Sequence, residues 1–484
     1  MIDPVVHITN LNLKYGQKTV LKDLSWVIKA GAQWLLCGPS GSGKTCLAKA
    51  IADQTAGAHY VANWYRFTDL EGQSNFYYQQ RYISQASTTA TVQAELEKYG
   101  QKQQLNFGTL DPLLEALGFS GLKNSALIEL SSGEHKKLQL VKALWLKPKL
   151  LILDQPYNGL DQQSRKSLNT LLDAYTSEGL QLILISNDTE LPACINRYAE
   201  IREGKLQEIQ AFERHSGTTE VISTAVPDFL RVASTPASPI VIDMRDVNIS
   251  YGGKPVLKNI SWKVKAGEKW LLQGHNGSGK STLLSLITGD HPQAYANDLH
   301  LFGSKRGSGE SIWEIKERIG MISPELHWYF DPAATVWQSV VSGFYDSSGL
   351  YCDPGYTRTE QANQLLKYFG LAEYQHVLMN TLPLGKQRLT LLARAIIKNP
   401  QLLILDEPCQ GLNQEQTRHF NALVDDLCQN GTTLIYVGHF ESQLPSSLEK
   451  KMVLENGSLK SIEDINRPVQ RRTLEQAEKI ELTN

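Results

Sequence analysis

The chain contains one long pattern twice, and this internal repeat is the feature that most limits how it can fold. Residues 11–49 read LNLKYGQKTVLKDLSWVIKAGAQWLLCGPSGSGKTCLAK, and residues 247–284 read VNISYGGKPVLKNISWKVKAGEKWLLQGHNGSGKSTLL. In both copies alternating apolar residues are followed by an apolar run that leads into glycines. This order predicts strand, loop and helix at the start of a parallel α/β core. The repeat therefore predicts two similar domains.

The later part of each half supports the same organisation. An apolar strand that ends in an acid is predicted at 150–156 (LLILDQP) and again at 402–408 (LLILDEP). A further apolar strand follows each of them, at 182–186 and 434–438. Continuous apolar runs of this length are typical of strands that are buried on both faces of a parallel sheet.

The composition of the intervening segments predicts the domain boundaries. Residues 211–240 are rich in Ser, Thr, Pro and Ala and show no helical stripe, so we interpret them as a linker. The first domain is then expected over 1–210 and the second over 241–465, and residues 466–484 are expected to form a polar C-terminal tail.

Charge, hydropathy and cysteine usage exclude several classes of protein. The formal net charge of -2 argues against nucleic acid as the main partner. No window approaches the run of about eighteen apolar residues that spans a bilayer, and the first residues lack a signal-peptide pattern. The six cysteines form no CxxC pair, as expected of a reduced cytosolic protein. We therefore expect a cytoplasmic protein, for which any membrane role requires a separate integral membrane subunit.

Two glycine-rich loops carry the strongest chemical signal. Residues 38–45 (GPSGSGKT) and 274–281 (GHNGSGKS) match G-x-x-x-x-G-K-[ST], and each follows a predicted strand and opens a predicted helix. Backbone N–H groups of such a loop wrap the phosphates of a bound nucleotide. The predicted nucleotide-binding positions are Gly38, Pro39, Ser40, Gly41, Ser42, Gly43, Lys44 and Thr45 in the first loop, and Gly274, His275, Asn276, Gly277, Ser278, Gly279, Lys280, Ser281 and Thr282 in the second.

Side chains in and near these loops are expected to hold the terminal phosphates and a magnesium ion. Lys44 and Lys280 would reach the β- and γ-phosphate oxygens. Hydroxyl and carboxylate oxygens are the ligands that Mg²⁺ prefers, and the apolar strands supply an acid at their ends. The expected Mg²⁺ ligands of this kind are Thr45, Ser281, Asp154 and Asp406.

The stretch LSSGEHKK at 130–137 resembles the signature of the ATP-binding-cassette (ABC) ATPases. This resemblance implies an α/β fold with two tandem P-loop nucleotide-binding domains, each with a mainly parallel core sheet, an antiparallel β subdomain and a helical signature subdomain. It also implies that Tyr15 and Tyr251 stack on adenine, although core packing is an alternative for both. By the same resemblance Gln85 senses Mg²⁺ and the membrane subunit.

The second half, at residues 281–316, is similar to the ModF type, whose members are tandem ATPases linked to molybdate transport operons and sometimes named photorepair proteins. In the family the two domains pair head to tail. The phosphate loop of one domain and the signature of the other then enclose each ATP. The resemblance therefore implies two composite sites, which we call site one (first phosphate loop, second signature) and site two (second phosphate loop, first signature).

Site one departs from the family pattern at four positions. The catalytic glutamate is replaced by Gln155, whose neutral amide cannot take a proton from water. The switch histidine is replaced by Asn187, and the opposing signature, LPLGKQR at 382–388, has Pro383 and Leu384 in place of serine and glycine. Proline is compatible with the start of a helix, so the helix is expected to persist without the hydroxyl donor.

Site two retains the hydrolytic residues. Glu407 is expected to polarise the attacking water, and His439 to hold the γ-phosphate in line beside Lys280. Ser131 is expected to neutralise charge that develops in the transition state. The other signature residues expected to contact nucleotide here are Ser132 and Gly133. One departure is Pro324, which stands where the sensing glutamine would fall.

We therefore expect an ATPase that binds ATP and Mg²⁺ and hydrolyses ATP mainly at site two. Energising a transporter from the inner face of the cell membrane is the favoured role, with molybdate suggested by the resemblance alone. The alternatives are a regulatory, repair or ribosome-associated ATPase, and a scaffold that binds ATP without hydrolysing it. The sparsely charged segment 211–240 disfavours the ribosome, and the absence of zinc-finger cysteines disfavours direct DNA binding.

Overall fold

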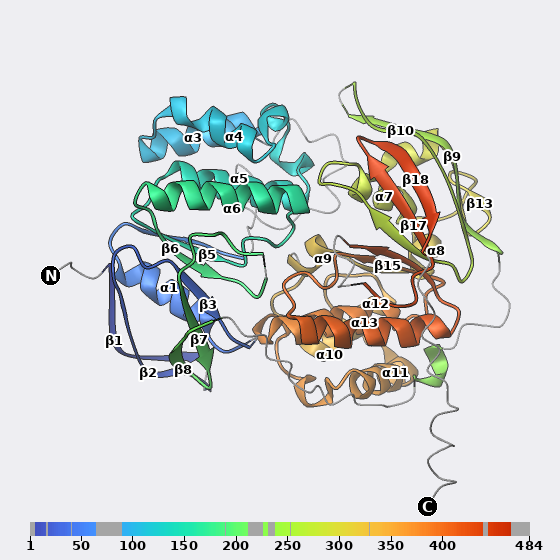
Figure 1. The fold of residues 1–484 in the computed structure, drawn as a ribbon. Helices are drawn as coiled ribbons and strands as arrows, with labels where there is room; N and C mark the ends of the chain where they lie inside the picture. The colour runs from blue at the N-terminus through green and yellow to red at the C-terminus, as the bar shows by residue number, and fades with distance from the viewer. Residues whose placement is uncertain are drawn as a thin grey trace, which may run out of the picture.

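The computed structural model describes residues 5–15, 18–39, 41–63, 90–188, 190–211, 226–230, 238–251, 253–328, 330–438 and 444–465. The two halves of the chain form two similar α/β units that lie side by side (Figure 1). The α/β fold with two nucleotide-binding-domain-like units is therefore confirmed, whereas the exact domain boundaries remain a prediction. Within the described residues, no helix combines the length and the apolar character needed to cross a membrane.

The first unit is built on a six-stranded sheet with the strand order β4-β5-β6-β3-β7-β8. Neighbouring strands are parallel except β8, which runs antiparallel to β7 at the edge. A separate antiparallel pair, β1 and β2, packs beside this sheet. The strands are β1 (Val6–Tyr15), β2 (Lys18–Ile28), β3 (Trp34–Cys37), β4 (Ala58–Val61), β5 (Leu150–Asp154), β6 (Gln181–Ile185), β7 (Arg197–Arg202) and β8 (Lys205–Ile209).

The helices of the first unit separate into a core helix and a helical layer. Helix α1 follows β3 directly, and the layer of α3 to α6 lies on the other side of the sheet (Figure 1). The helices are α1 (Lys44–Gln54), α3 (Val92–Gln103), α4 (Leu110–Ala116), α5 (Ser132–Trp145) and α6 (Gln162–Ser177), with short 3₁₀ turns η2 (Phe107–Thr109), η3 (Ser120–Leu122) and η4 (Leu127–Glu129).

The second unit repeats this plan with a larger antiparallel sheet. Its core sheet has the order β14-β15-β16-β11-β17-β18, and a four-stranded antiparallel sheet has the order β10-β9-β12-β13. The strands are β9 (Ile240–Tyr251), β10 (Lys254–Lys265), β11 (Lys269–Gln273), β12 (Asp298–Leu301), β13 (Ser304–Lys305), β14 (Ile319–Ile322), β15 (Leu402–Asp406), β16 (Thr433–Val437), β17 (Lys450–Glu455) and β18 (Ser458–Asp464).

The second unit has seven α-helices among its described residues. They are α7 (Lys280–Ile287), α8 (Ile312–Glu317), α9 (Pro324–Trp328), α10 (Val336–Val341), α11 (Gly355–Tyr368), α12 (Leu384–Ile396) and α13 (Gln414–Gln429), with 3₁₀ turns η5 (Asp228–Leu230), η6 (Pro292–Ala296), η7 (Ser342–Phe344), η8 (Ala372–Tyr374) and η9 (Met379–Thr381). Figure 1 shows α3 to α5 at the top of the first unit and α10 to α12 at the bottom of the second. The two units therefore lie in opposite orientations.

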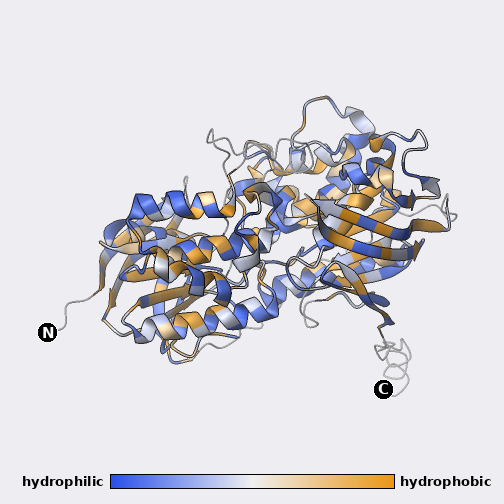
Figure 2. Cartoon of the chain, turned by 90° about the horizontal axis from the view of Figure 1, so that it is seen from above, coloured by the Kyte–Doolittle hydropathy of each residue, from blue (hydrophilic) through white to orange (hydrophobic). Residues whose placement is uncertain are grey.

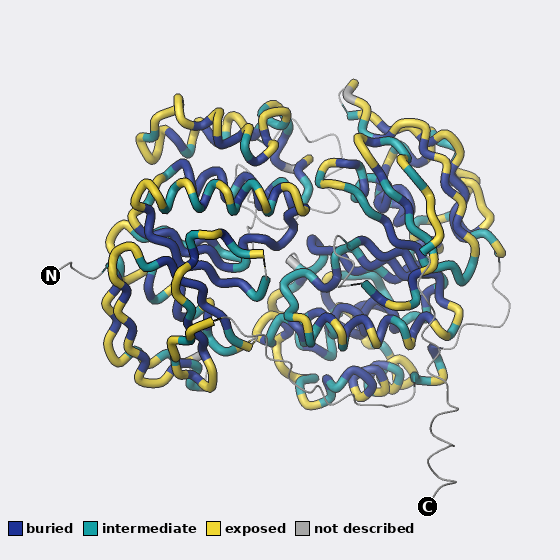
Figure 3. The backbone as a smooth tube through the Cα atoms, viewed as in Figure 1, coloured by how far each residue is buried: buried dark blue, intermediate teal, exposed yellow. Residues whose placement is uncertain are grey.

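The central strands are buried because apolar residues cover both of their faces. Every residue of β5, β6 and β16 is buried, as continuous apolar runs predict for parallel strands. Figure 3 shows the buried backbone concentrated in the sheets of both units, and Figure 2 shows polar and apolar residues alternating along the strands and helices around them.

The same pair of tryptophans joins the antiparallel strands to the core sheet in each unit. Trp26 and Trp34 meet edge to face with ring centroids 5.1 Å apart, and Trp262 and Trp270 do so at 5.5 Å. This geometry is the one that aromatic rings prefer, and all four side chains are buried. The repeat seen in the sequence is thus also a repeat of packing.

Part of the segment interpreted as a linker packs on the second unit. Leu230 is buried in the hydrophobic cluster of that unit, and Val226 and Phe229 pack against the same cluster. The described part of this segment is therefore held by apolar contacts, although its composition predicted only a connection.

Candidate functional site

Each glycine-rich loop joins a buried strand to a helix, as its spacing predicts. The helices α1 and α7 begin at Lys44 and Lys280, directly after Gly43 and Gly279. These glycines have φ of 102° and 100°, which is the left-handed region. A Cβ atom at Gly43 would lie 2.8 Å from the Leu21 side chain, and one at Gly279 would lie 2.6 Å from Leu257. Both the left-handed backbone and the lack of space for a Cβ atom therefore require glycine at these two positions.

The two loop lysines point back into their own loops. The Lys44 ammonium donates hydrogen bonds to the carbonyls of Gly38 and Pro39, both at 2.7 Å. The Lys280 ammonium donates in the same way to Gly274 at 2.7 Å and to His275 at 3.0 Å. Neutral carbonyls hold both cations at the loop, where an anionic phosphate would be the stronger partner.

Burial perturbs the protonation of both lysines. It lowers the pKa of Lys44 to about 8, although the nearby Asp154 carboxylate opposes the shift. Burial also lowers the pKa of Lys280, against the opposing charges of Glu407 and Asp406. A phosphate placed beside either group would favour the charged form.

The side chains around the two loops fit a bound nucleotide and Mg²⁺. The Oγ atoms of Ser42 and Ser278 are buried and have no hydrogen-bond partner among the described residues. The Thr45 hydroxyl donates to Asp154 Oδ2 at 2.6 Å, so two oxygen ligands already converge. These features fit phosphate oxygens and Mg²⁺, which would be held by Thr45 and Asp154 and would neutralise phosphate charge.

The corresponding acid of the second unit has the same place in the fold. Asp406 ends β15, and Ser281 stands in the first turn of α7. Because β15 and β11 both lie in the central sheet, the acid and the loop meet at the same sheet edge. Ser281 and Asp406 would hold Mg²⁺ in site two.

The first signature meets the second phosphate loop across the two units. A Cβ atom at Gly133 would lie 2.3 Å from Asn276 Nδ2 and 2.3 Å from the Gly159 carbonyl. The Asn276 side chain donates to that carbonyl at 2.8 Å, and its backbone N–H donates to Asp161 Oδ2 at 3.0 Å. The structure therefore brings the residues predicted for site two into direct contact.

Asp161 is the ionic part of this contact. Burial raises the pKa of its carboxyl, but hydrogen bonds from Ser164 and Asn276, together with Lys137, outweigh burial and lower it to about 2. The carboxylate is therefore ionised throughout the physiological range. It also caps α6, because its Oδ1 accepts the Ser164 N–H at 2.8 Å.

The two signature helices differ at their first residue. Ser131 caps α5: its Oγ accepts the Glu134 N–H at 3.3 Å, and Glu134 Oε2 accepts the Ser131 N–H at 2.7 Å. Pro383 stands at the matching position of α12 and makes no side-chain cap. The expectation that this helix persists without its hydroxyl is confirmed.

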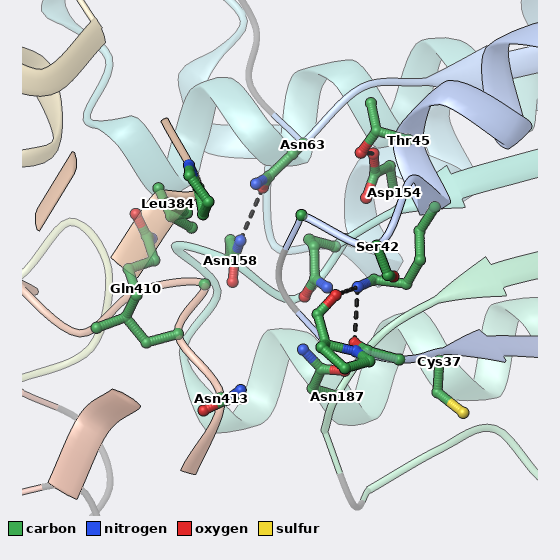
Figure 4. A pocket seen from close by; sticks show the side chains of 18 of the residues that line it. Cys37, Ser42, Thr45, Asn63, Asp154, Asn158, Asn187, Leu384, Gln410 and Asn413 are labelled. Atoms are coloured by element: carbon green, nitrogen blue, oxygen red, sulfur yellow. Dashed lines mark hydrogen bonds between the residues drawn. The ribbon is translucent and has the colours of Figure 1, made fainter. Parts of the chain in front are cut away.

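Site one has an open cavity between the first loop and the second signature. Its volume is about 1530 Å³, and Figure 4 shows Asp154, Asn187 and Leu384 among the residues around it. A Cβ atom at Gly41 would lie 3.4 Å from Pro383 Cγ, so the loop and the altered signature face each other. Gln155 also lines this cavity.

The residues after the two strand acids share an unusual backbone. Glu407 has φ of 45° and Gln155 has φ of 48°, values that L residues rarely adopt. Their N–H groups donate to the neighbouring strands, at Val437 over 3.2 Å and at Ile185 over 2.8 Å. The same strained turn is kept in both units, whether it presents an acid or an amide.

Several predicted positions lie outside the described residues, namely Ser40, Gln85, His439 and the side chain of Tyr15. Tyr251 is half-buried at the end of β9, and its hydroxyl hydrogen-bonds with His291 Nε2 at 2.7 Å. Its ring also packs against the apolar cluster beneath it. The predicted packing of this ring is therefore observed, and stacking on adenine stays a prediction.

Sequence reasoning missed four polar residues near the sites. Asn158 Nδ2 donates to Asn63 Oδ1 at 2.7 Å, and Gln410 Nε2 donates to Glu407 Oε2 at 3.0 Å. The buried Lys136 ammonium donates to the carbonyls of Ala62 and Asn63. The only signal in the sequence was that Asn158 and Gln410 follow their strand acids at equal spacing.

Replacing Gly133 with alanine should disrupt site two. The added methyl group would overlap Asn276 and Gly159, so the signature could not approach the second loop. We expect steady-state ATP hydrolysis to fall by at least about tenfold, equivalent to roughly 1.4 kcal/mol. Gly385→Ala is the matched control, because the atoms nearest to a Cβ there belong to the Gln416 side chain of its own unit. An equal loss in both variants would contradict the assignment.

At pH values above the pKa of Lys44, nucleotide binding should be coupled to the uptake of a proton. A bound triphosphate favours the ammonium, so affinity should weaken by up to about tenfold per pH unit above roughly pH 8. Calorimetry in buffers of different ionisation enthalpy, at roughly pH 7 and roughly pH 9, measures this uptake. Lys44→Arg, which stays protonated, should reduce it. Equal proton uptake at the two pH values would contradict the prediction.

Comparison with known proteins identifies relatives over most of the chain. The chain is 34% identical over 462 residues to the ABC transporter ATP-binding protein ModF of Escherichia coli, which covers 88% of this chain and 91% of that protein. It is 28% identical over 473 residues to an uncharacterized ABC transporter ATP-binding protein of Schizosaccharomyces pombe, covering 91% and 96%.

A shorter relative matches about half of the chain. An uncharacterized ABC transporter ATP-binding protein, YlmA of Bacillus subtilis, is 30% identical over 222 residues, 46% of this chain and 84% of its own length. The family model described as ABC transporter matches twice, at residues 21–158 and 257–410. Each match contains one phosphate loop and one strand acid. The chain therefore belongs to the ABC transporter family, as an ATP-binding protein with two ABC domains of the kind represented by ModF.

Proposed function

We propose that this chain hydrolyses ATP, with Mg²⁺, mainly at site two. The observation that carries the proposal is the difference between the residues that follow the two strand acids. Glu407 can accept a proton from water, whereas Gln155 cannot. Both occupy the same turn of the backbone, so the contrast is one of chemistry rather than of position.

In the proposed reaction the residues of both units act on one nucleotide. Lys280 binds the β- and γ-phosphates, and Glu407 orients a water molecule and accepts its proton. The N-terminus of α5, with Ser131 as its cap, faces the same site and stabilises negative charge that develops on the phosphate. Ser281 and Asp406 would hold Mg²⁺, which would neutralise phosphate charge.

Site one is proposed to bind ATP without rapid turnover. Lys44, Thr45 and Asp154 retain the groups that hold phosphate and Mg²⁺. Pro383 removes the signature hydroxyl, and a hydrogen bond of that kind to a charged group contributes roughly 1.5–3 kcal/mol. Site one then keeps the two units together while site two opens and closes.

The proposed asymmetry predicts opposite outcomes for two substitutions. Glu407→Gln should lower steady-state hydrolysis by about 10²–10⁴-fold, because it removes the general base. Gln155→Ala should leave most of the activity. A phosphate-release assay on the purified full chain measures both. The reverse ranking would eliminate the proposal, and loss in neither variant would favour a scaffold that only binds ATP.

We propose that the energy of hydrolysis drives a transporter whose membrane subunits are separate chains. The support is the similarity to ModF over most of both proteins, and the molybdate link of the ModF type makes an oxyanion system the first candidate. In this arrangement the chain lies in the cytoplasm on the inner face of the membrane.

One observation favours a second candidate, a regulatory or repair ATPase without a membrane partner. Pro324 begins α9 where the sensing glutamine of the family would stand, and it is buried. The Ser323 hydroxyl accepts the Leu326 N–H at 3.1 Å, so this short helix is capped within its own unit. This segment lacks the side chain through which the family senses its membrane subunit.

Trapping the closed state should identify the client. The full-length Glu407→Gln variant, bound to ATP in detergent-solubilised cells, is expected to retain an integral membrane protein, because closed ABC pairs hold their partner. The same variant without nucleotide is the control. Recovery of ribosomes or DNA-associated proteins, or of no ATP-dependent partner, would move the assignment to the second candidate.

A further inference from the structure

Two matched residues follow the strand acids and lie at the junction of the units. Asn158 is the fourth residue after Asp154, and Gln410 is the fourth residue after Asp406. Both side chains are amides, but they differ by one methylene group. Figure 4 shows both beside the cavity of site one.

Gln410 reaches the catalytic candidate of its own unit. Its Nε2 donates to Glu407 Oε2 at 3.0 Å. An ionised carboxylate can only accept hydrogen bonds, so the amide nitrogen must be the atom that faces it. The hydrogen bond fixes one carboxylate oxygen and therefore the direction of the other.

Asn158 makes a different contact. Its Nδ2 donates to Asn63 Oδ1 at 2.7 Å (Figure 4). The shorter side chain belongs to the unit whose strand acid is followed by an amide. The unit with the carboxylate has the longer side chain, which spans the distance to it.

Gln410 also touches the other unit. Its Nε2 lies 3.1 Å from the position that a Cβ atom would take at Gly159. The Gly159 carbonyl accepts a hydrogen bond from Asn276 of the second phosphate loop. A continuous series of contacts therefore runs from Asn276 through Gly159 and Gln410 to Glu407.

The amide oxygen of Gln410 has no hydrogen-bond partner among the described residues. This Oε1 atom is buried. A buried acceptor of this kind requires a donor, and a water molecule beside Glu407 would supply one. The side chain can thus hold the carboxylate with one atom and accept from water with the other.

We propose that Gln410 is a positioning residue that orients the Glu407 carboxylate and makes this orientation depend on contact with Gly159 of the other unit. The inference rests on the proposed function, because it assigns Glu407 as the general base. When the units separate, Gly159 withdraws from Gln410 and the carboxylate loses its fixed direction. Hydrolysis at site two is thereby restricted to the closed pair.

The test compares Gln410→Ala with the matched variant Asn158→Ala in the full chain. We expect Gln410→Ala to lower kcat by about tenfold or more while KM for ATP changes less than about twofold. Asn158→Ala should cause a clearly smaller loss of kcat. Gln410→Asn, which keeps the amide but is one methylene shorter, should behave like Gln410→Ala and serves if the alanine variant does not fold.

A double-mutant cycle separates positioning from a general structural effect. In the Glu407→Gln background, adding Gln410→Ala should change the residual single-turnover rate by less than about twofold. An undiminished effect in that background, or equal losses for Gln410→Ala and Asn158→Ala, would overturn the inference and leave the proposed function intact. Substantial activity of Glu407→Gln itself would instead remove the proposed function.

Discussion

The hydrogen bonds of Asn276 to Gly159 and Asp161 are the interaction on which the rest of the site depends. They join the second phosphate loop to the first unit and bring Gly133 against the same side chain. The contact requires glycine at position 133, because a Cβ atom there would lie 2.3 Å from Asn276 Nδ2. The proposed nucleotide sites combine residues of both units, so this contact connects the packing of the units to their proposed chemistry.

The two composite sites show how a fold can be retained while its chemistry changes. Ser131 and Pro383 both stand at the N-cap of a signature helix, and α12 forms although Pro383 provides no side-chain cap. Glu407 and Gln155 both occupy a left-handed turn at the end of a strand. At these positions the backbone is therefore similar in both units, and the side chains distinguish the two sites.

Burial explains the electrostatics of both sites. Burial of the loop lysines lowers the pKa of both ammonium groups, whereas the carbonyl oxygens that accept their hydrogen bonds stabilise the charged forms. Asp161 is also partly buried, but backbone N–H groups compensate for its charge. The site is thus organised for a negatively charged ligand before one binds.

Much of the fold and of the candidate site could be predicted from the sequence, because they depend on local patterns. The repeated strands, the two glycine-rich loops and the positions of Lys44 and Lys280 follow from periodicity and spacing within short segments. Sequence also showed that Gln155 and Glu407 differ. Each of these features involves residues that are neighbours in the chain.

Only the tertiary structure decided which distant residues meet. Asn276 and Gly159 are separated by more than a hundred residues, and no local pattern specifies their hydrogen bond. The partners of Asn158 and Gln410 likewise depend on side-chain length and on how the units pack. Such contacts depend on how the surfaces of the two units pack against each other. These surfaces exist only after each unit has folded around its own core.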